Sequence, residues 1–418
     1  MTAVLPLDPV RERGVLLTLA GIQFAHILDF MIVMPLGPIL MRALGVGTHE
    51  FGFLVSSYSL TAGVSGLLAA TVVDRFERKR LLLVLFALFG IATLACALAP
   101  GYWLLLLARC LAGAFGGVLG AMVQTMVGDL IPFERRGRAS GTIMSAFSLS
   151  TIAGVPLSLW LANHFGWRTP FLFIAVITLG LLLLGWRALP ELRSHLQHAS
   201  AAETDKAERA HPLASIGAAL RDTNHWHALL FMTLAVFSGF TVIPYITIYL
   251  TANVGIRQED IPLIYLVGGA ASFLTARRIG ALADHHGKVR IYRLVAIGSL
   301  LPLFLQTHLP PVPLWLIVAC TTLFFVLVPG RMVPVMAIVT SAAQPRLRGT
   351  FLSINSAVQS FASGSAAWLG GALITLDAKG QVAGYGGVGW LAMAMTVLAI
   401  AYVGRISTPN NHTRSFQA

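Results

Sequence analysis

Hydrophobic positions along the chain fall in long runs, and polar positions gather between those runs. A helix needs about 20 mainly apolar residues to cross a bilayer. Strands of a membrane β-barrel would instead show alternating segments of about 10 residues. We therefore predict an all-α membrane protein with twelve transmembrane helices. The runs are 15–40, 50–72, 81–99, 102–127, 139–162, 170–189, 226–251, 261–282, 291–308, 314–339, 350–376 and 386–404.

One long polar stretch divides these runs into six and six. It covers 190–224 and carries acidic and basic residues in close succession, which is typical of a solvated segment. We predict an N-terminal six-helix bundle over 1–189, a cytoplasmic linker over 190–224, and a C-terminal six-helix bundle with a short cytoplasmic tail over 225–418.

Two loop sequences occur once in each half. DRFERKR begins at Asp74 and GALADHHGKVR begins at Gly280, and their acids Asp74 and Asp284 lie 210 residues apart. RRGR surrounds Gly137 and RLRG ends at Gly349, 212 residues further on. The two similar offsets indicate an internal repeat, so we expect two pseudo-symmetric bundles. Transporters built from such repeats place their transport site where the repeats meet.

The charge distribution fixes the expected orientation. Of 29 Lys and Arg residues, 23 fall on the side that holds both termini, 4 on the other side and 2 within runs. Because basic loops stay cytoplasmic, we predict a multi-pass protein of the inner (plasma) membrane with both termini in the cytoplasm. The net charge of +12 is therefore explained by topology, and we expect the lipid bilayer, and no nucleic acid, as partner.

Catalytic chemistry finds no support in the sequence. Only 11% of the residues are charged, against about 25% in soluble proteins. The three cysteines all lie in apolar runs, with no metal spacing and no disulfide framework. Nucleophile–base sets and phosphate loops are missing from the pattern. We expect no enzyme activity, no cofactor and no metal, and we expect a monomer.

The repeated loop resembles the hallmark loop of the major facilitator superfamily. That loop runs Gly, three residues, Asp, a basic residue, one residue, Gly and further basic residues. The second copy keeps Gly280, Asp284, Gly287, Lys288 and Arg290. The first copy keeps Asp74, Arg75, Arg78 and Lys79, with Ala70 and Glu77 where glycines are usual. The resemblance covers nearly the whole chain.

A further resemblance is to the twelve-span drug–proton antiporter branch. Arg109 with Gly113 looks like the branch's fourth-span motif, and Gly154 to Pro156 looks like its fifth-span motif. Ser158 and Leu159 stand where that motif closes with glycines. The resemblance implies alternating access and proton-coupled efflux (antiport) of a small organic molecule, with protons and that substrate as partners. The alternatives are proton-coupled uptake of a sugar-like or acidic metabolite, and a non-transporting membrane sensor.

Asp29 is the only one of the 17 acids that lies well inside a run. A carboxylate at that depth is costly and usually functional. The resemblance places spans one, four, seven and ten around a cavity, which would bring Arg109 close to Asp29. We expect Asp29 to exchange a proton when substrate separates it from Arg109; the alternative is a permanently charged structural pair. His26 shares the helix face of Asp29 and is either a proton relay or a packing residue.

Arg331 lies in VPGRMVP, where two prolines and a glycine predict an irregular helix. It either faces the cavity and holds an anionic group, or extends toward the cytoplasm. A cavity with Arg109, Arg331 and Asp29 would favour anionic or zwitterionic substrates. Tyr245 belongs either to the substrate site or to the interfacial aromatic belt. Further candidates for substrate binding are Tyr58, Gln124, Phe237, Thr241, Asn355 and Gln359.

The repeated loops also suggest a gate. The resemblance places each loop against the start of a helix in the other half, where an acid is stabilised by about 0.3–1 kcal/mol. Such contacts would act as a latch that breaks when the cytoplasmic side opens. The alternative is that the basic clusters only fix topology. The candidate gating residues are Asp74, Arg75, Arg78, Gly280 and Asp284.

Overall fold

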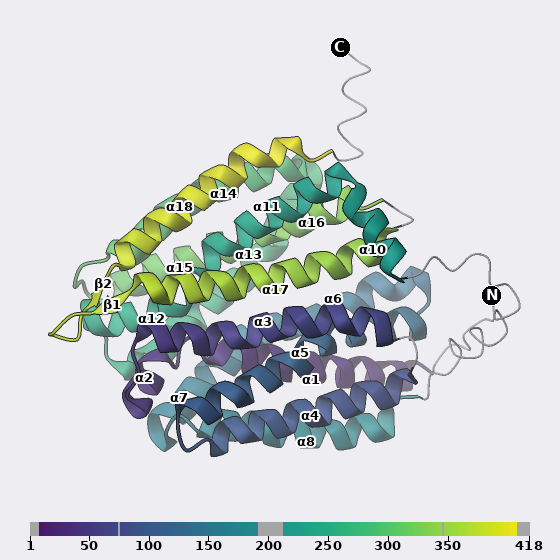
Figure 1. The fold of residues 1–418 in the computed structure, drawn as a ribbon, viewed down its shortest axis with the longest axis horizontal. Coiled ribbons are helices and arrows are strands. Elements are labelled where there is room, and N and C mark those ends of the chain that lie inside the picture. Colours follow the sequence, from purple (N-terminus) through teal and green to yellow (C-terminus); the bar gives the residue numbers. More distant parts are fainter. Residues whose placement is uncertain (1–7, 74–75, 191–211, 345–346, 408–418) are drawn as a thin grey trace, which may run out of the picture. The chain divides into compact units, whose positions relative to one another are not determined.

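The computed structural model describes residues 8–73, 76–190, 212–344 and 347–407, and nearly all of them are helical (Figure 1). They form two compact units. Unit 1 contains the described residues up to Val33 and those from Ser57 to 190. Unit 2 contains Met34–Ser56 and the described residues from 212 onward.

Unit 1 is a bundle of long helices around an apolar interior. Helix α1 packs against α6 and α8, and α4 packs against α5 and α8. Its core is built from fully buried side chains such as Ile22, Phe86 and Met122. The helices are α1 (Pro9–Ile32), the later part of α3 (Thr48–Val72), α4 (Arg78–Leu98), α5 (Tyr102–Leu130), α6 (Phe133–Leu149), α7 (Val155–Phe165) and α8 (Thr169–Ala188).

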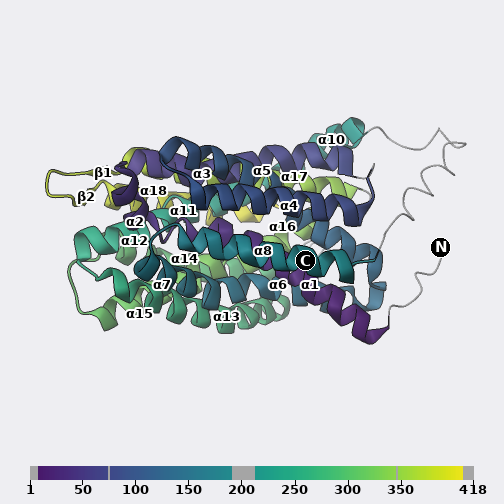
Figure 2. The same ribbon diagram turned by 90° about the horizontal axis from the view of Figure 1, so that it is seen from below.

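Unit 2 is a second bundle, in which α11 packs against α17 and α18, α13 against α15, and α14 against α15 and α18. Figures 1 and 2 show α14 and α18 lying side by side, with a short hairpin of β1 and β2 beyond the end of α17. Its elements are α2 (Gly37–Leu44), α10 (Pro212–Arg221), α11 (Thr223–Phe240), α12 (Ile246–Tyr249), α13 (Ile261–His286), α14 (Lys288–His308), α15 (Leu314–Gly330), α16 (Met332–Ala342), α17 (Arg348–Leu373), β1 (Thr375–Leu376), β2 (Val382–Ala383) and α18 (Tyr385–Tyr402).

The twelve predicted spans all correspond to helices of the structure. Within the described ranges, ten helical stretches are long and apolar enough to cross a membrane. The other two predicted spans are α13 and α17, each 26 residues long. They are less apolar, since α13 carries Arg277 and Arg278 and α17 is rich in serine and glycine. The chain is a multi-pass helical membrane protein, as the pattern of apolar runs predicts.

Several spans are interrupted, and proline or glycine lies at each break. The first span consists of α1 and α2, joined by a turn that contains Pro35. The fifth contains a π-helical segment, η2 (Ser150–Gly154), which ends two residues before Pro156. The tenth breaks at Arg331, between α15 and α16. Proline has no N–H to donate to the preceding turn, so the helix changes its hydrogen bonding there.

The predicted linker ends in a helix. Most of that linker, residues 191–211, lies outside the described residues. Its last part forms α10, which packs against α17 and buries Ala219. A stretch that its charge content predicts to be solvated therefore includes a packed helix of ten residues before the seventh span begins.

Candidate functional site

Asp29 and Arg109 form a fully buried ion pair in unit 1. Asp29 lies one turn before the end of α1 and is 0% exposed, and Arg109, from α5, is 1% exposed. Arg109 Nη1 lies 2.6 Å from Asp29 Oδ2. The same nitrogen also donates to the main-chain carbonyl of Asp29 at 3.1 Å. Thr93 of α4 donates to the other carboxylate oxygen at 3.4 Å.

Tyr58 completes the surroundings of Arg109. Its ring centroid lies 4.6 Å from Arg109 Cζ, and the Tyr58 side chain is almost fully buried. The close approach depends on Gly113, one turn after Arg109 on α5. A Cβ at Gly113 would lie 2.6 Å from Tyr58 Cα, so only glycine lets α5 pass α3 at this distance. This contact gives a physical reason for the Arg109–Gly113 spacing.

The ion pair depends on one strong contact. A single guanidinium nitrogen serves both a carboxylate oxygen and a main-chain carbonyl, so the pair is not the bidentate arrangement that gives arginine–carboxylate pairs their strength. A carboxylate without water needs such a partner, because removing one member of a buried pair is strongly unfavourable. Among the described residues, Arg109 is the one cation within ion-pair distance of the Asp29 carboxylate.

His26 lies one turn before Asp29 on α1 and faces α5. A Cβ at Gly120 would lie 3.6 Å from His26 Nε2 and 3.8 Å from the side-chain amide of Gln23. Both His26 Nε2 and Gln23 Oε1 are buried and lack a hydrogen-bond partner among the described residues. Sequence reasoning missed Gln23, although its three-residue spacing from His26 places both on one helix face.

Arg331 is a buried arginine of unit 2, at the break between α15 and α16, and its partners include three hydroxyl groups. It is 1% exposed, so the prediction that it could extend to the cytoplasmic surface is wrong. Nη1 donates to Thr396 Oγ1 at 2.8 Å and to Ser299 Oγ at 3.3 Å. Nη2 donates to Ser238 Oγ at 2.9 Å and to the Ala235 carbonyl at 3.3 Å.

These hydroxyls are also satisfied as donors. Ser238 and Thr396 each donate to the Ala392 carbonyl, at 2.7 and 2.9 Å, and Ser299 donates to the Ala296 carbonyl at 2.7 Å. Each therefore has a lone pair left to accept from Arg331. Among the described residues no carboxylate lies within ion-pair distance of Arg331. In unit 1, Arg109 is thus paired with a carboxylate. In unit 2, the side-chain partners of Arg331 are hydroxyl groups.

Tyr245 is a packing residue in this structure. It is 0% exposed, so its alternative assignment to the interfacial aromatic belt is wrong. Its hydroxyl donates to the Ala367 carbonyl at 2.5 Å. A Cβ at Gly52 would lie 2.7 Å from that hydroxyl, so Tyr245 lies tightly against the first turns of α3 within unit 2.

The remaining substrate-binding candidates lie in different parts of the two units. Gln124 is half-buried and accepts from Ser140 at 3.4 Å in unit 1. Thr241 is buried and donates to the Ser238 carbonyl at 3.2 Å. Asn355 is buried, with no partner for its Oδ1 among the described residues. Phe237 and Gln359 are both half-buried.

The loop between α3 and α4 is described only in part. Asp74 and Arg75 lie outside the described residues. Arg78 is buried and its Nε lies 2.5 Å from Asp129 Oδ2. Glu77 caps α4, accepting from the main-chain N–H groups of residues 79 and 80 at 3.0 and 2.8 Å. An acid therefore replaces the usual glycine of the loop and stabilises the start of a helix.

The corresponding loop of unit 2 keeps its glycines. Gly287 has φ +93°, a conformation that other residues rarely adopt, and it ends α13 directly before α14. Gly280 faces α16, since a Cβ there would lie 3.7 Å from Val333. Asp284 is exposed at the end of α13. These positions fit a loop built on the repeated sequence, and its gating role stays a prediction.

Comparison with known proteins identifies the family. A family model described as Major Facilitator Superfamily matches residues 19–367. The chain belongs to the major facilitator superfamily.

Two relatives and one solved structure are described as transporters. "Uncharacterized MFS-type transporter YwfA" of Bacillus subtilis is 28% identical over 387 residues, which are 90% of this chain and 87% of the relative. "Probable sugar efflux transporter" of Pasteurella multocida is 28% identical over 195 residues, which are 46% of this chain and 48% of the relative. A solved bacterial homolog of the human lysosomal transporter Spinster has a TM-score of 0.73 at 15% identity, covering 95% of this chain and 97% of that chain. This chain is therefore similar to secondary transporters in sequence and in fold.

Proposed function

We propose that this transporter exports a small organic molecule in exchange for protons by alternating access. The observation that carries the proposal is the buried pair of Asp29 and Arg109 in unit 1. A membrane helix bundle gains nothing from a buried carboxylate as packing alone, because an apolar residue of similar size would serve as well or better.

The geometry of the pair favours a switch over a fixed structural contact. Asp29 Oδ2 has one strong partner, and Oδ1 has only the 3.4 Å contact with Thr93. If Arg109 moves toward another anion or acceptor, the carboxylate loses the one cation that pairs with it among the described residues. A lone carboxylate in an apolar interior then takes up a proton, because burial penalises the charged form. Substrate and proton would thus compete for the same pair.

His26 and Gln23 extend the polar surface by one and two turns along α1. Their buried atoms, which lack partners in the part of the chain that the structure describes, suit a water or a substrate hydroxyl. We propose that His26 passes protons between Asp29 and the aqueous side, since an imidazole ring carries both a donor and an acceptor nitrogen.

Direction and substrate class rest on the relatives and on motifs. The fourth- and fifth-span motifs resemble those of antiporters, and one relative carries the description of a sugar efflux transporter. Arg331 gives less support for an anionic substrate than its position in the sequence suggests, because its guanidinium group already donates hydrogen bonds to four protein oxygens. We propose export from the cytoplasm across the inner membrane by a monomer with both termini cytoplasmic.

The test is transport by the full chain in proteoliposomes that carry an imposed pH gradient and an internal pH dye. Candidate sugars and aromatic acids are screened with wild type, Asp29→Asn and Asp260→Asn. Asp260 is a matched control, because it is an acid paired with Arg257 at 3.0 Å outside the spans. Wild type and Asp260→Asn should concentrate the substrate against its gradient as protons flow the other way.

Asp29→Asn should lose this accumulation while retaining substrate exchange in the absence of a gradient. Continued accumulation by Asp29→Asn would contradict the role of Asp29. Movement of substrate in the same direction as protons would support uptake instead of export. The absence of any pH change with every substrate would favour the sensor.

A further inference from the structure

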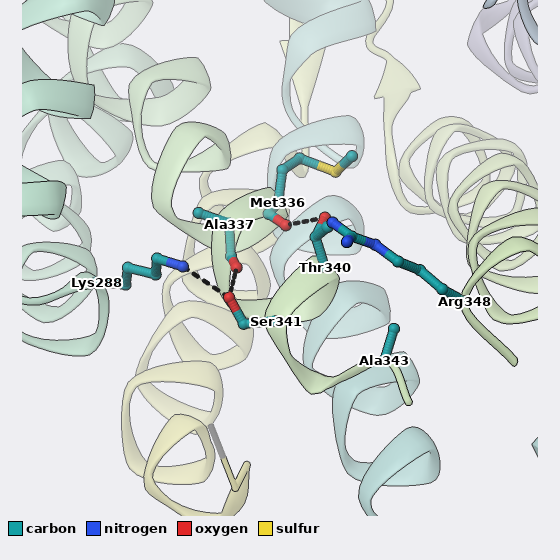
Figure 3. Close-up of a pocket in the computed structure, with 7 residues that line it drawn as sticks. All are labelled: Lys288, Met336, Ala337, Thr340, Ser341, Ala343 and Arg348. Carbon is teal, nitrogen blue, oxygen red and sulfur yellow. Dashed lines mark hydrogen bonds between the residues drawn. The ribbon is translucent and has the colours of Figure 1, made fainter. Parts of the chain in front are cut away.

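Unit 2 contains a cavity of about 530 Å³ at the ends of three helices, α14, α16 and α17 (Figure 3). We call it the basic cavity, after its four polar lining residues Lys288, Thr340, Ser341 and Arg348. Figure 3 shows Lys288 and Arg348 reaching in from opposite sides, with the two hydroxyl residues between them. The remaining wall is formed by Met336, Ala337 and Ala343.

Both cations stand at the first residue of a helix. Lys288 begins α14 and Arg348 begins α17, and neither helix has a side-chain hydrogen bond at its N-cap. The partial positive charge of each helix start therefore adds to the side-chain charge instead of being offset by a capping acid. Among the described residues no carboxylate lies within ion-pair distance of Lys288 or Arg348.

The hydrogen bonds leave the cations with donors to spare. Lys288 Nζ donates to Ser341 Oγ at 2.7 Å, which fixes the ammonium group in the cavity and uses one of its three hydrogens. Ser341 donates to the Ala337 carbonyl at 2.6 Å and Thr340 to the Met336 carbonyl at 2.7 Å. The cavity thus offers N–H donors and positive charge, and its described residues contribute no anionic acceptor.

We propose that the basic cavity binds a phosphate group, and that its occupant is the head group of an anionic phospholipid. Phosphate oxygens match two cations and helix starts better than any neutral ligand does. The wall of Met336, 41% exposed, suits the glycerol and first acyl carbons of a lipid. The basic loops place this end of unit 2 at the cytoplasmic leaflet, where anionic lipids are found.

The experiment measures thermal stabilisation of the full chain in neutral detergent by three probes. They are short-chain phosphatidylglycerol, short-chain phosphatidylcholine and inorganic phosphate. One variant combines Lys288→Gln with Arg348→Gln. Arg290→Gln is the control. Arg290 is an exposed cation on the same helix that does not line the cavity. A third variant, Ser341→Asp, places a fixed carboxylate beside Lys288 and should keep the protein folded.

Phosphatidylglycerol should stabilise wild type and Arg290→Gln more than phosphatidylcholine does. Loss of both cations should weaken its apparent Kd about thirtyfold, or about fivefold for each cation. Ser341→Asp should lose the preference while melting no earlier than wild type without lipid. Stabilisation by inorganic phosphate as well would support phosphate recognition and add soluble phosphate compounds as ligands. Equal effects of the two lipids on wild type, or an unchanged preference in Ser341→Asp, would overturn the proposal.

Discussion

Replacing Arg109 and Arg331 in turn by methionine distinguishes a buried arginine paired with a carboxylate from one whose side-chain partners are hydroxyl groups. Arg109→Met removes the cation that pairs with Asp29, whose side chain is 0% exposed. Losing one member of a buried ion pair costs about 3–5 kcal/mol, because the other group either stays charged without a partner or must take up a proton. We expect the free energy of unfolding to fall by that amount near neutral pH, and by less in acidic buffer, where a proton neutralises the carboxylate.

Arg331→Met removes four hydrogen bonds yet leaves no donor unsatisfied. The three hydroxyls that accept from Arg331 keep donating to helix carbonyls. The substitution also removes a buried cation that has no carboxylate partner among the described residues. These effects offset one another, so we expect a change within about 1 kcal/mol of wild type.

The assay is denaturant unfolding of the purified protein in detergent, followed by tryptophan fluorescence at neutral and acidic pH. Asp29→Asn combined with Arg109→Met should recover most of the stability lost in Arg109→Met, since no lone charge remains. Equal destabilisation by Arg109→Met and Arg331→Met, or no recovery in the double variant, would refute this interpretation of the two arginines.

Two further predictions concern local packing in unit 1. A Cβ at Gly117 would lie 2.6 Å from Ala62 Cα, so Gly117→Ala should destabilise the protein by about 1–3 kcal/mol. Gly128→Ala in the same helix meets nothing within 4 Å and should be neutral or slightly stabilising in thermal unfolding. Glu77→Ala removes the cap of α4 and should cost about 0.5–2 kcal/mol, whereas Glu77→Asp should retain most of that stability.

The sequence predicts the spans well because membrane crossing imposes a length and an apolar composition on each one. The breaks are predicted only where proline marks them, as in VPGRMVP around Arg331. The π-helical segments depend on how neighbouring helices fill space, and no short pattern in the chain records that. The same holds for α10, whose burial of Ala219 follows from packing against a helix more than 120 residues later in the sequence.

Side-chain partners are harder to predict than spans. The expectation that Arg109 approaches Asp29 rests on family resemblance, and the structure places Arg109 Nη1 2.6 Å from Asp29 Oδ2. The hydroxyl partners of Arg331 come from three helices far apart in the sequence, so spacing along the chain gives no indication of them. The position of Tyr245 is ambiguous from the sequence, because a tyrosine near a span end suits either the membrane interface or the protein interior. Its burial and its hydrogen bond to the Ala367 carbonyl place it in the interior.

The central claim is that the ionisation of Asp29 changes during the transport cycle. Infrared difference spectroscopy of the protein in lipid, recorded between neutral and acidic pH with and without substrate, reports protonated carboxyl groups directly. We predict a carboxyl band that appears on acidification, shifts when substrate binds, and is missing in Asp29→Asn but present in Asp260→Asn. A spectrum in which Asp29→Asn removes no titrating band would show a permanently charged pair and would contradict the account.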